Sequence, residues 1–150
     1  MEKKEKEEWS YKIIRNVISS EYLNLLDMYF YKRREILKTM LESKYCSAEE
    51  NVFGAIGDGQ PGVKSDTFSI YGDVMTEMLM ENLKDFMEKE TNMSLVPSYG
   101  YMRIYQKGDG LSPHFDRPSC EISTTINISG DMWPIFLKLD EETTIKAELE

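Results

Sequence analysis

The sequence predicts an α+β fold in which two helices precede an antiparallel sheet that curls toward a jelly roll. Two long stretches, 19–43 and 73–90, repeat apolar residues at three- and four-residue steps, the spacing of one helix face. From Met93 onward, apolar residues alternate with polar ones and β-branched residues are frequent, which favours strands to the end of the chain. A chain of 150 residues is long enough for one domain with its own core.

Composition and charge indicate an acidic, soluble protein with a net charge of −9. No basic stripe is present to neutralise phosphates, so nucleic-acid binding is not expected. The mixed-charge residues 1–10 contain no apolar run, so we expect a disordered tail and neither a signal peptide nor a membrane-bound segment. The two cysteines, Cys46 and Cys120, lack metal-ligand spacing, which predicts reduced thiols and a cytoplasmic location.

The N-terminal half begins with β-branched residues. The segment Tyr11–Ile18 is a candidate short strand, and Ser19 or Ser20 is the expected N-cap of a core-packing helix that reaches about Ser43. An aromatic and methionine stripe that receives a partner is the alternative role of this helix. The glycine-rich stretch Lys44–Lys64 lacks the Gly-Lys-Ser/Thr ending of a phosphate loop, so we expect a mobile loop over a substrate groove.

The next elements are predicted from alternation and turn residues. Asp66–Tyr71 is a strand with Phe68 and Ile70 on one face, and Gly72-Asp73 ends it and caps a second helix to about Glu90. That helix presents one stripe of apolar residues: Met75, Met78, Leu79, Leu83, Phe86 and Met87. Two further strands are expected, one from Tyr99 to Tyr105 and one from Glu121 to Ser129, with a hairpin turn at Lys107–Gly110.

His114 is the chain's one histidine, and Asp116 follows it by two positions. Residues i and i+2 of a strand point to the same face, so the imidazole and the carboxylate would converge at the start of a strand. This convergence predicts a metal site. The alternative is a solvated or hydrogen-bonded histidine, since an acidic residue occurs two positions after a histidine by chance often enough.

Two arginines and a cysteine lie near this pair in the sequence. Arg103 shares a strand face with Tyr105 and is expected to line a cavity or to pair with an acid such as Asp116. Arg117 should point away from Asp116, toward solvent or substrate. For Cys120, a small buried residue on a strand is the favoured interpretation.

Several motifs together carry a resemblance to a known family. They are an aromatic strand ending in Tyr105, the turn Gly108-Asp109-Gly110, and Leu111-Ser-Pro-His-Phe-Asp116. Trp133-Pro134-Ile135 opens a later strand, and Phe68–Gly72 precedes the second helix. Over roughly residues 66–149, and most sharply over about twenty residues around the histidine, the chain resembles the Fe(II)/2-oxoglutarate-dependent dioxygenases of the prolyl-hydroxylase-like branch.

The resemblance implies a double-stranded β-helix and an Fe(II) ion held by two histidines and one carboxylate. His114 and Asp116 would be two of these three ligands, and the Tyr105 hydroxyl would bind the distal carboxylate of 2-oxoglutarate, with ascorbate as a further cofactor. Packing within the sheet is the alternative role of Tyr105. The implied reaction uses dioxygen, converts 2-oxoglutarate to succinate and carbon dioxide, and hydroxylates a prolyl or other side chain of a protein or peptide, or a small molecule.

The chain departs from the family in its second half. It has no second histidine, and only 36 residues follow His114. The remaining five strands of a jelly roll would need roughly 45. We therefore expect a single domain, residues 11–150, truncated before the distal-histidine strand, inactive alone, and prone to self-association through an open sheet edge. A non-catalytic β-rich interaction domain with a vestigial metal site remains the alternative, and a cupin-type metal protein a third, although cupins usually bring more histidines.

Overall fold

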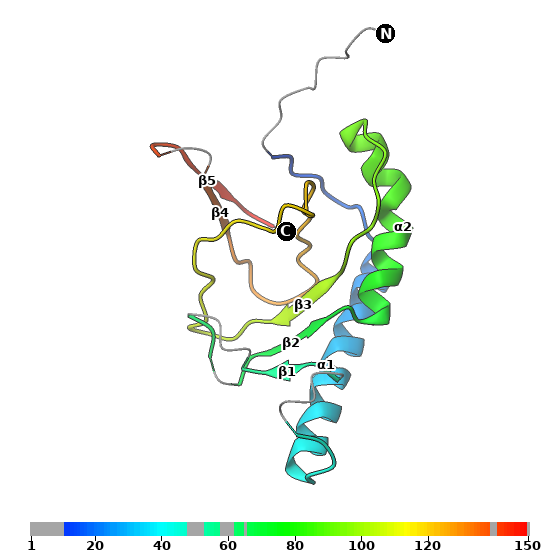
Figure 1. The fold of residues 1–150 in the computed structure, drawn as a ribbon, viewed down its shortest axis with the longest axis vertical. Coiled ribbons are helices and arrows are strands. Elements are labelled where there is room, and N and C mark those ends of the chain that lie inside the picture. The colour runs from blue at the N-terminus through cyan, green and yellow to red at the C-terminus, as the bar shows by residue number, and fades with distance from the viewer. Residues whose placement is uncertain (1–10, 48–52, 58–61, 65, 139–140, 150) are drawn as a thin grey trace, which may run out of the picture. The chain divides into compact units, whose positions relative to one another are not determined.

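A computed structural model describes residues 11–47, 53–57, 62–64, 66–138 and 141–149 (Figure 1). The predicted tail 1–10 and part of the predicted loop 44–64 lie outside these residues. The α+β class is confirmed, with two helices and small antiparallel sheets. The elements in chain order are α1 (Ser20–Glu42), β1 (Ala55–Ile56), β2 (Phe68–Tyr71), α2 (Val74–Thr91), β3 (Tyr101–Ile104), β4 (Ile135–Lys138) and β5 (Thr144–Ala147).

The chain divides into two compact units. The central unit comprises Met28–Ser123, and the terminal unit comprises Met1–Asp27 with Thr124–Glu150. The described strands form two separate sheets, a three-stranded one of order β1-β2-β3 and the two-stranded β4-β5. A double-stranded β-helix is not confirmed by this arrangement and stays a prediction.

Helix α1 begins where the sequence predicts it. The backbone N–H of Tyr22 donates to the Ser19 hydroxyl at 3.3 Å, and that of Leu23 donates to the Ser19 carbonyl at 3.0 Å, so Ser19 is the N-cap. Leu26, Phe30 and Leu37 are buried along one side of the helix, as the apolar spacing predicts.

The central sheet separates a packed face from an exposed one. Strand β2 pairs antiparallel with β3, so that Ile70 lies opposite Met102 and Tyr71 lies opposite Tyr101. Ile70 and Met102 are 4% and 6% exposed, whereas Tyr71 and Tyr101 are 54% and 43% exposed. The face of Ile70 and Met102 is therefore buried, and the face of Tyr71 and Tyr101 is exposed. The buried apolar residues of the central unit are Phe30, Leu37, Phe68, Ile70, Leu79 and Met102.

Asp73 joins the two helices within the central unit. It caps α2 by accepting from the backbone N–H of Met75 at 2.9 Å, as predicted. Its carboxylate also accepts from the Tyr29 hydroxyl at 3.0 Å and lies 3.3 Å from Nε of Arg33, both on α1. The Asp73 side chain is only 3% exposed, and its charge is matched by hydrogen bonds from Met75 and Tyr29 and by the ion pair with Arg33.

Gly100 allows the start of β3 to lie against α2. A Cβ atom at this position would be 2.5 Å from the side chain of Thr76, closer than real atoms approach. The Gly100 N–H donates to the Glu77 carboxylate at 2.9 Å, and its carbonyl accepts from Gly72 N–H at 2.9 Å. These contacts hold the end of β2 and the start of β3 beside the first turn of α2.

Two predicted strands are wrong. The segments 11–18 and 121–129 contain no strand, and between β3 and β4 the chain forms neither helix nor strand (Figure 1). Alternating and β-branched residues form a strand only where a neighbour supplies backbone hydrogen bonds. The prediction of strands from Met93 onward therefore holds only for β3, β4 and β5, and the turn at Lys107–Gly110 closes no hairpin.

Strand β1 lies within the stretch predicted as a loop. Ala55 and Ile56 pair antiparallel with Ser69 and Phe68 of β2. Two residues are too few to show a periodic pattern, and the pairing depends on the backbone of β2 rather than on side chains.

The strands expected near the C-terminus are present in the terminal unit, where they form a hairpin. Strands β4 and β5 pair antiparallel from Ile135 opposite Ala147 to Lys138 opposite Thr144. Each strand is hydrogen-bonded on one side within the described residues, so the hairpin has two open edges. Neither helix of the described chain is sufficiently long and apolar to cross a bilayer.

Candidate metal pair and tyrosine–arginine face

The structure brings His114 and Asp116 together. Nε2 of the imidazole lies 3.7 Å from Oδ1 of the carboxylate, and the two side chains are about half exposed, at 53% and 48%. These two residues, named the metal pair after their predicted role, lie in a segment between β3 and β4 that is neither helix nor strand. The prediction of a strand here is wrong, but the predicted approach of the two side chains is observed.

The second polar atom of each side chain is already engaged. Nδ1 of His114 lies 2.9 Å from the carbonyl oxygen of Ser112, so the ring donates its Nδ1–H there and Nε2 is the ring atom that faces Asp116. Oδ2 of Asp116 accepts from the Ser123 hydroxyl at 2.5 Å, which leaves Oδ1 facing the imidazole. Metal-binding histidines and carboxylates are commonly oriented by hydrogen bonds of this kind.

The pair fits a shared metal ion after a small adjustment. With metal–ligand bonds of about 2.1 Å, an N and an O atom bound at a right angle are about 3.0 Å apart, and at the tetrahedral angle about 3.4 Å. The observed separation of 3.7 Å is slightly longer. Among the described residues, no group of three or more His, Cys, Asp or Glu side chains could hold a metal. The described part of the chain therefore offers two protein ligands.

The turn before the metal pair is fixed by Asp109. Its carboxylate accepts from the Thr67 hydroxyl at 2.7 Å, from the backbone N–H of Lys64 at 2.8 Å, and from that of Gln106 at 2.6 Å. Burial raises the pKa of Asp109, but these hydrogen bonds outweigh it and hold the pKa below its usual value. Gly110 N–H also donates to the Gly62 carbonyl at 2.7 Å, so the turn is fastened to the segment that precedes β2.

Tyr105 lies on the exposed face of the central sheet. Arg103 donates to the hydroxyls of Tyr105 and Tyr101 at 3.2 and 2.6 Å, and its guanidinium lies 5.3 and 5.1 Å from the centres of their rings. These contacts confirm that Arg103 and Tyr105 share a face. The hydroxyl and the ring of Tyr105 are thus both in contact with the Arg103 guanidinium.

Arg117 stacks on two other tyrosines. Its guanidinium carbon lies 5.2 Å from the centre of the Tyr99 ring and 5.8 Å from that of Tyr71, and the two rings are 4.7 Å apart. Tyr71 lies opposite Tyr101, and Tyr99 is two residues before Tyr101. The rings of Tyr71 and Tyr99 therefore occupy the same sheet face as Tyr105. We name Tyr71, Tyr99, Tyr101, Arg103 and Tyr105 the tyrosine–arginine face.

A β-turn holds Arg117 in this position. The N–H of Cys120 donates to the Arg117 carbonyl at 2.8 Å, with Pro118 in the second place of the turn, where its fixed φ is favoured. The same turn brings the Cys120 thiol to 3.6 Å from the Tyr99 hydroxyl. The contact with Cys120 and the burial of the ring raise the pKa of Tyr99, and the negative charge of Asp116 acts in the same direction. Tyr99 is therefore protonated near neutral pH.

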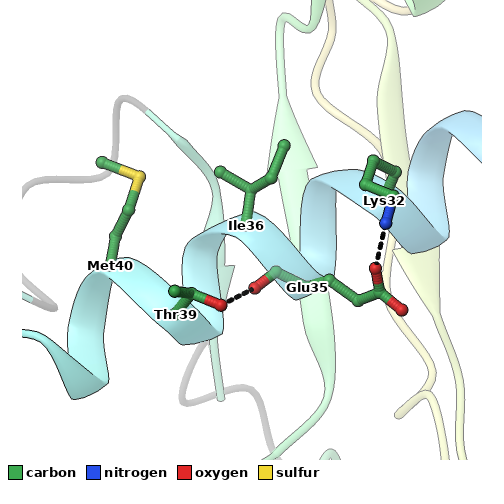
Figure 2. Close-up of a pocket in the computed structure, with 5 residues that line it drawn as sticks. All are labelled: Lys32, Glu35, Ile36, Thr39 and Met40. Carbon is green, nitrogen blue, oxygen red and sulfur yellow. Dashed lines mark hydrogen bonds and ion pairs between the residues drawn. The ribbon is translucent and has the colours of Figure 1, made fainter.

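A hollow of about 250 Å³ lies elsewhere in the central unit, on one side of α1. Figure 2 shows the side chains that line it, with Lys32 paired to Glu35 at 2.5 Å and the Thr39 hydroxyl donating to the Glu35 carbonyl. All five lining residues belong to a single helix. The hollow contains none of the predicted site residues.

Comparisons with protein-family models, with curated proteins and with solved structures find no match to this chain. The case for a function therefore rests on the residues themselves. The roles predicted for His114, Asp116 and Tyr105 stay predictions, and Ser123 and Tyr99 were not among the predicted site residues. The β-rich pattern around Tyr99 was the available signal, since alternation places it on the face of Tyr101.

Proposed function

We propose that this chain carries the His-x-Asp part of the Fe(II) site of a 2-oxoglutarate-dependent oxygenase. One observation carries the proposal. Nε2 of His114 and Oδ1 of Asp116 face each other at 3.7 Å, while the remaining polar atom of each side chain is held by a separate hydrogen bond. Strands β2 and β3 would belong to the double-stranded β-helix that the resemblance implies.

Each residue would have a defined role. His114 would bind the metal through Nε2 as a neutral ring, with the Ser112 carbonyl fixing its orientation, and Asp116 would bind through Oδ1. Tyr105 would hold the distal carboxylate of 2-oxoglutarate through its hydroxyl. Bound Fe(II) and 2-oxoglutarate would supply the oxidising chemistry that no side chain can provide.

Metal binding can be read directly at His114. In untagged protein its imidazole ¹⁵N signals are unique, because the chain has one histidine. Mn(II), which shares the ligand preference for nitrogen and oxygen donors, should broaden these signals selectively and give a saturable change in its electron paramagnetic resonance spectrum. His114→Ala and Asp116→Asn should abolish the saturable binding, whereas Asp85→Asn, which removes an exposed carboxylate from α2, should leave it unchanged.

Imidazole signals that stay sharp during this titration would reject the proposal and favour the non-catalytic interaction domain. With two protein ligands from the described residues, we expect weak metal binding and little or no succinate formation by the chain alone. Fe(II)-dependent succinate production that His114→Ala abolishes would contradict this expectation about turnover.

A further inference from the structure

Arg117 adjoins the metal pair but faces a different set of side chains. It follows Asp116 directly, so their Cα atoms are about 3.8 Å apart. The Asp116 carboxylate contacts Ser123 and His114, whereas the Arg117 guanidinium lies on the rings of Tyr71 and Tyr99. A group bound at Arg117 would therefore be adjacent to the metal pair without competing for its ligand atoms.

The Arg117 guanidinium, held over the rings of Tyr71 and Tyr99, has a geometry suited to binding an anion. A guanidinium that lies on an aromatic ring keeps its N–H groups directed outward in one plane, and this fork matches the two oxygens of a carboxylate. Among the ion pairs of the described residues none involves Arg117, so no acidic side chain there occupies the fork. The hydroxyl of Tyr99 accepts from the Cys120 thiol and still has its own proton to donate.

The charge around Arg117 favours a carboxylate over a phosphate. Phosphate sites usually combine several cations or the N-terminus of a helix. Arg117 is a single cation beside Asp116, in a chain of net charge −9. A carboxylate group places one negative charge at this site, whereas a phosphate group near neutral pH would place up to two there and be repelled more strongly by the surrounding charge.

We propose that Arg117 and Tyr99 bind a carboxylate of the oxygenase substrate, on a shelf formed by Tyr71, Tyr99 and Arg117. The site would thus select acidic molecules or acidic side chains as primary substrates. The identification of the bound carboxylate as part of a substrate rests on the proposed function. Binding of a carboxylate to the shelf itself can be measured without any metal. The co-substrate 2-oxoglutarate also has a carboxylate, but Tyr105, in contact with a different arginine, is its proposed partner.

Glutarate is a suitable probe because it has carboxylates but no 2-oxo group, so its binding needs no metal. Titrated into metal-free protein, it should shift the Nε–Hε signal of Arg117 with saturation. Arg117→Gln should raise the dissociation constant at least about tenfold, and Arg117→Lys, which keeps the charge but loses the planar fork, by about threefold. Lys89→Gln removes an exposed positive charge from α2 and should change nothing.

Two results would overturn the shelf: the absence of a saturable shift with glutarate, or unchanged affinity in folded Arg117→Gln. His114→Ala should bind glutarate as the wild type does, because the shelf does not include the metal ligands. A failure of the shelf is therefore distinguishable from a failure of the metal pair to bind Mn(II). The source of the carboxylate is tested with Mn(II) and 2-oxoglutarate together. Unchanged 2-oxoglutarate affinity in Arg117→Gln supports a primary-substrate site, and a loss of about tenfold would overturn that assignment in favour of the co-substrate.

Discussion

Replacing Asp73 should reveal how strongly the buried carboxylate holds α1 and α2 together. Asp73→Ala removes the N-cap of α2, which costs about 1 kcal/mol. It also leaves the Tyr29 hydroxyl without its acceptor, at a cost of about 1 kcal/mol or more, since this group is partly buried. Arg33 loses its ion-pair partner as well, and because its Nε is itself buried, this loss adds to the cost.

The expected loss is about 3 kcal/mol, well above that of an ordinary surface substitution. Asp73→Asn is the matched variant, because asparagine is also a good N-cap and keeps one oxygen for Met75 and Tyr29. It removes only the charge, so we expect a loss of about 1 kcal/mol. Glu81→Ala, on the exposed side of α2, should change stability by less than about 0.5 kcal/mol.

Urea unfolding followed by circular dichroism would measure these differences. With a slope of about 2 kcal/mol per molar, Asp73→Ala should lower the midpoint by roughly 1.5 M and Asp73→Asn by roughly 0.5 M. If Asp73→Ala costs no more than Asp73→Asn, then the oxygen that asparagine keeps contributes no stability through Met75 or Tyr29. The argument that this buried cluster joins the two helices would then be refuted.

Three further results are expected. The pKa of Asp109 is lowered in the fold, so its carboxylate should stabilise the fold fully above the unfolded pKa of about 3.9, and this stabilisation should be lost as pH falls through the lower folded pKa. The difference in thermal midpoint between wild type and Asp109→Asn should shrink over the same pH range. A difference that stays constant with pH would count against this role of Asp109. Gly100→Ala should destabilise the fold by about 1–3 kcal/mol because a Cβ atom would clash with Thr76 of α2. Gly110→Ala, whose Cβ would meet nothing nearer than 3.9 Å, should be tolerated in the same thermal melt. Equal effects of the two substitutions would contradict the clash at Gly100. Ser123→Ala should weaken Mn(II) binding about tenfold by releasing the Asp116 carboxylate, and an unchanged titration would show that the hydrogen bond does not orient it.

The helices could be predicted from the sequence because their signals are local. Ser19 and Asp73 are side chains that cap the residues immediately after them, and the apolar spacing between the caps marks one helix face. The β2 strand was also recognised, since Phe68 and Ile70 alternate with polar residues within one short run.

Strand pairing could not be predicted in this way because it depends on distant segments. The run Glu121–Ser129 has a strand-like composition but finds no backbone partner among the described residues, whereas Ala55–Ile56 has no pattern and pairs with β2. The candidate site shows the same division. The approach of His114 to Asp116 follows from spacing along the chain, while the contact between Arg117 and Tyr71 joins residues that only the fold brings together.

The division into two units also separates the tryptophans from the metal pair and the shelf. Trp133 belongs to the terminal unit, and the sequence between Met28 and Ser123, which contains the metal pair and the shelf, has no tryptophan. Fluorescence excited at a wavelength that only tryptophan absorbs therefore comes from the terminal unit. A ligand that binds at Arg117 or His114 and yet alters this emission would have changed the surroundings of a residue in the other unit. Tryptophan emission is thus a built-in reporter of coupling between the two units.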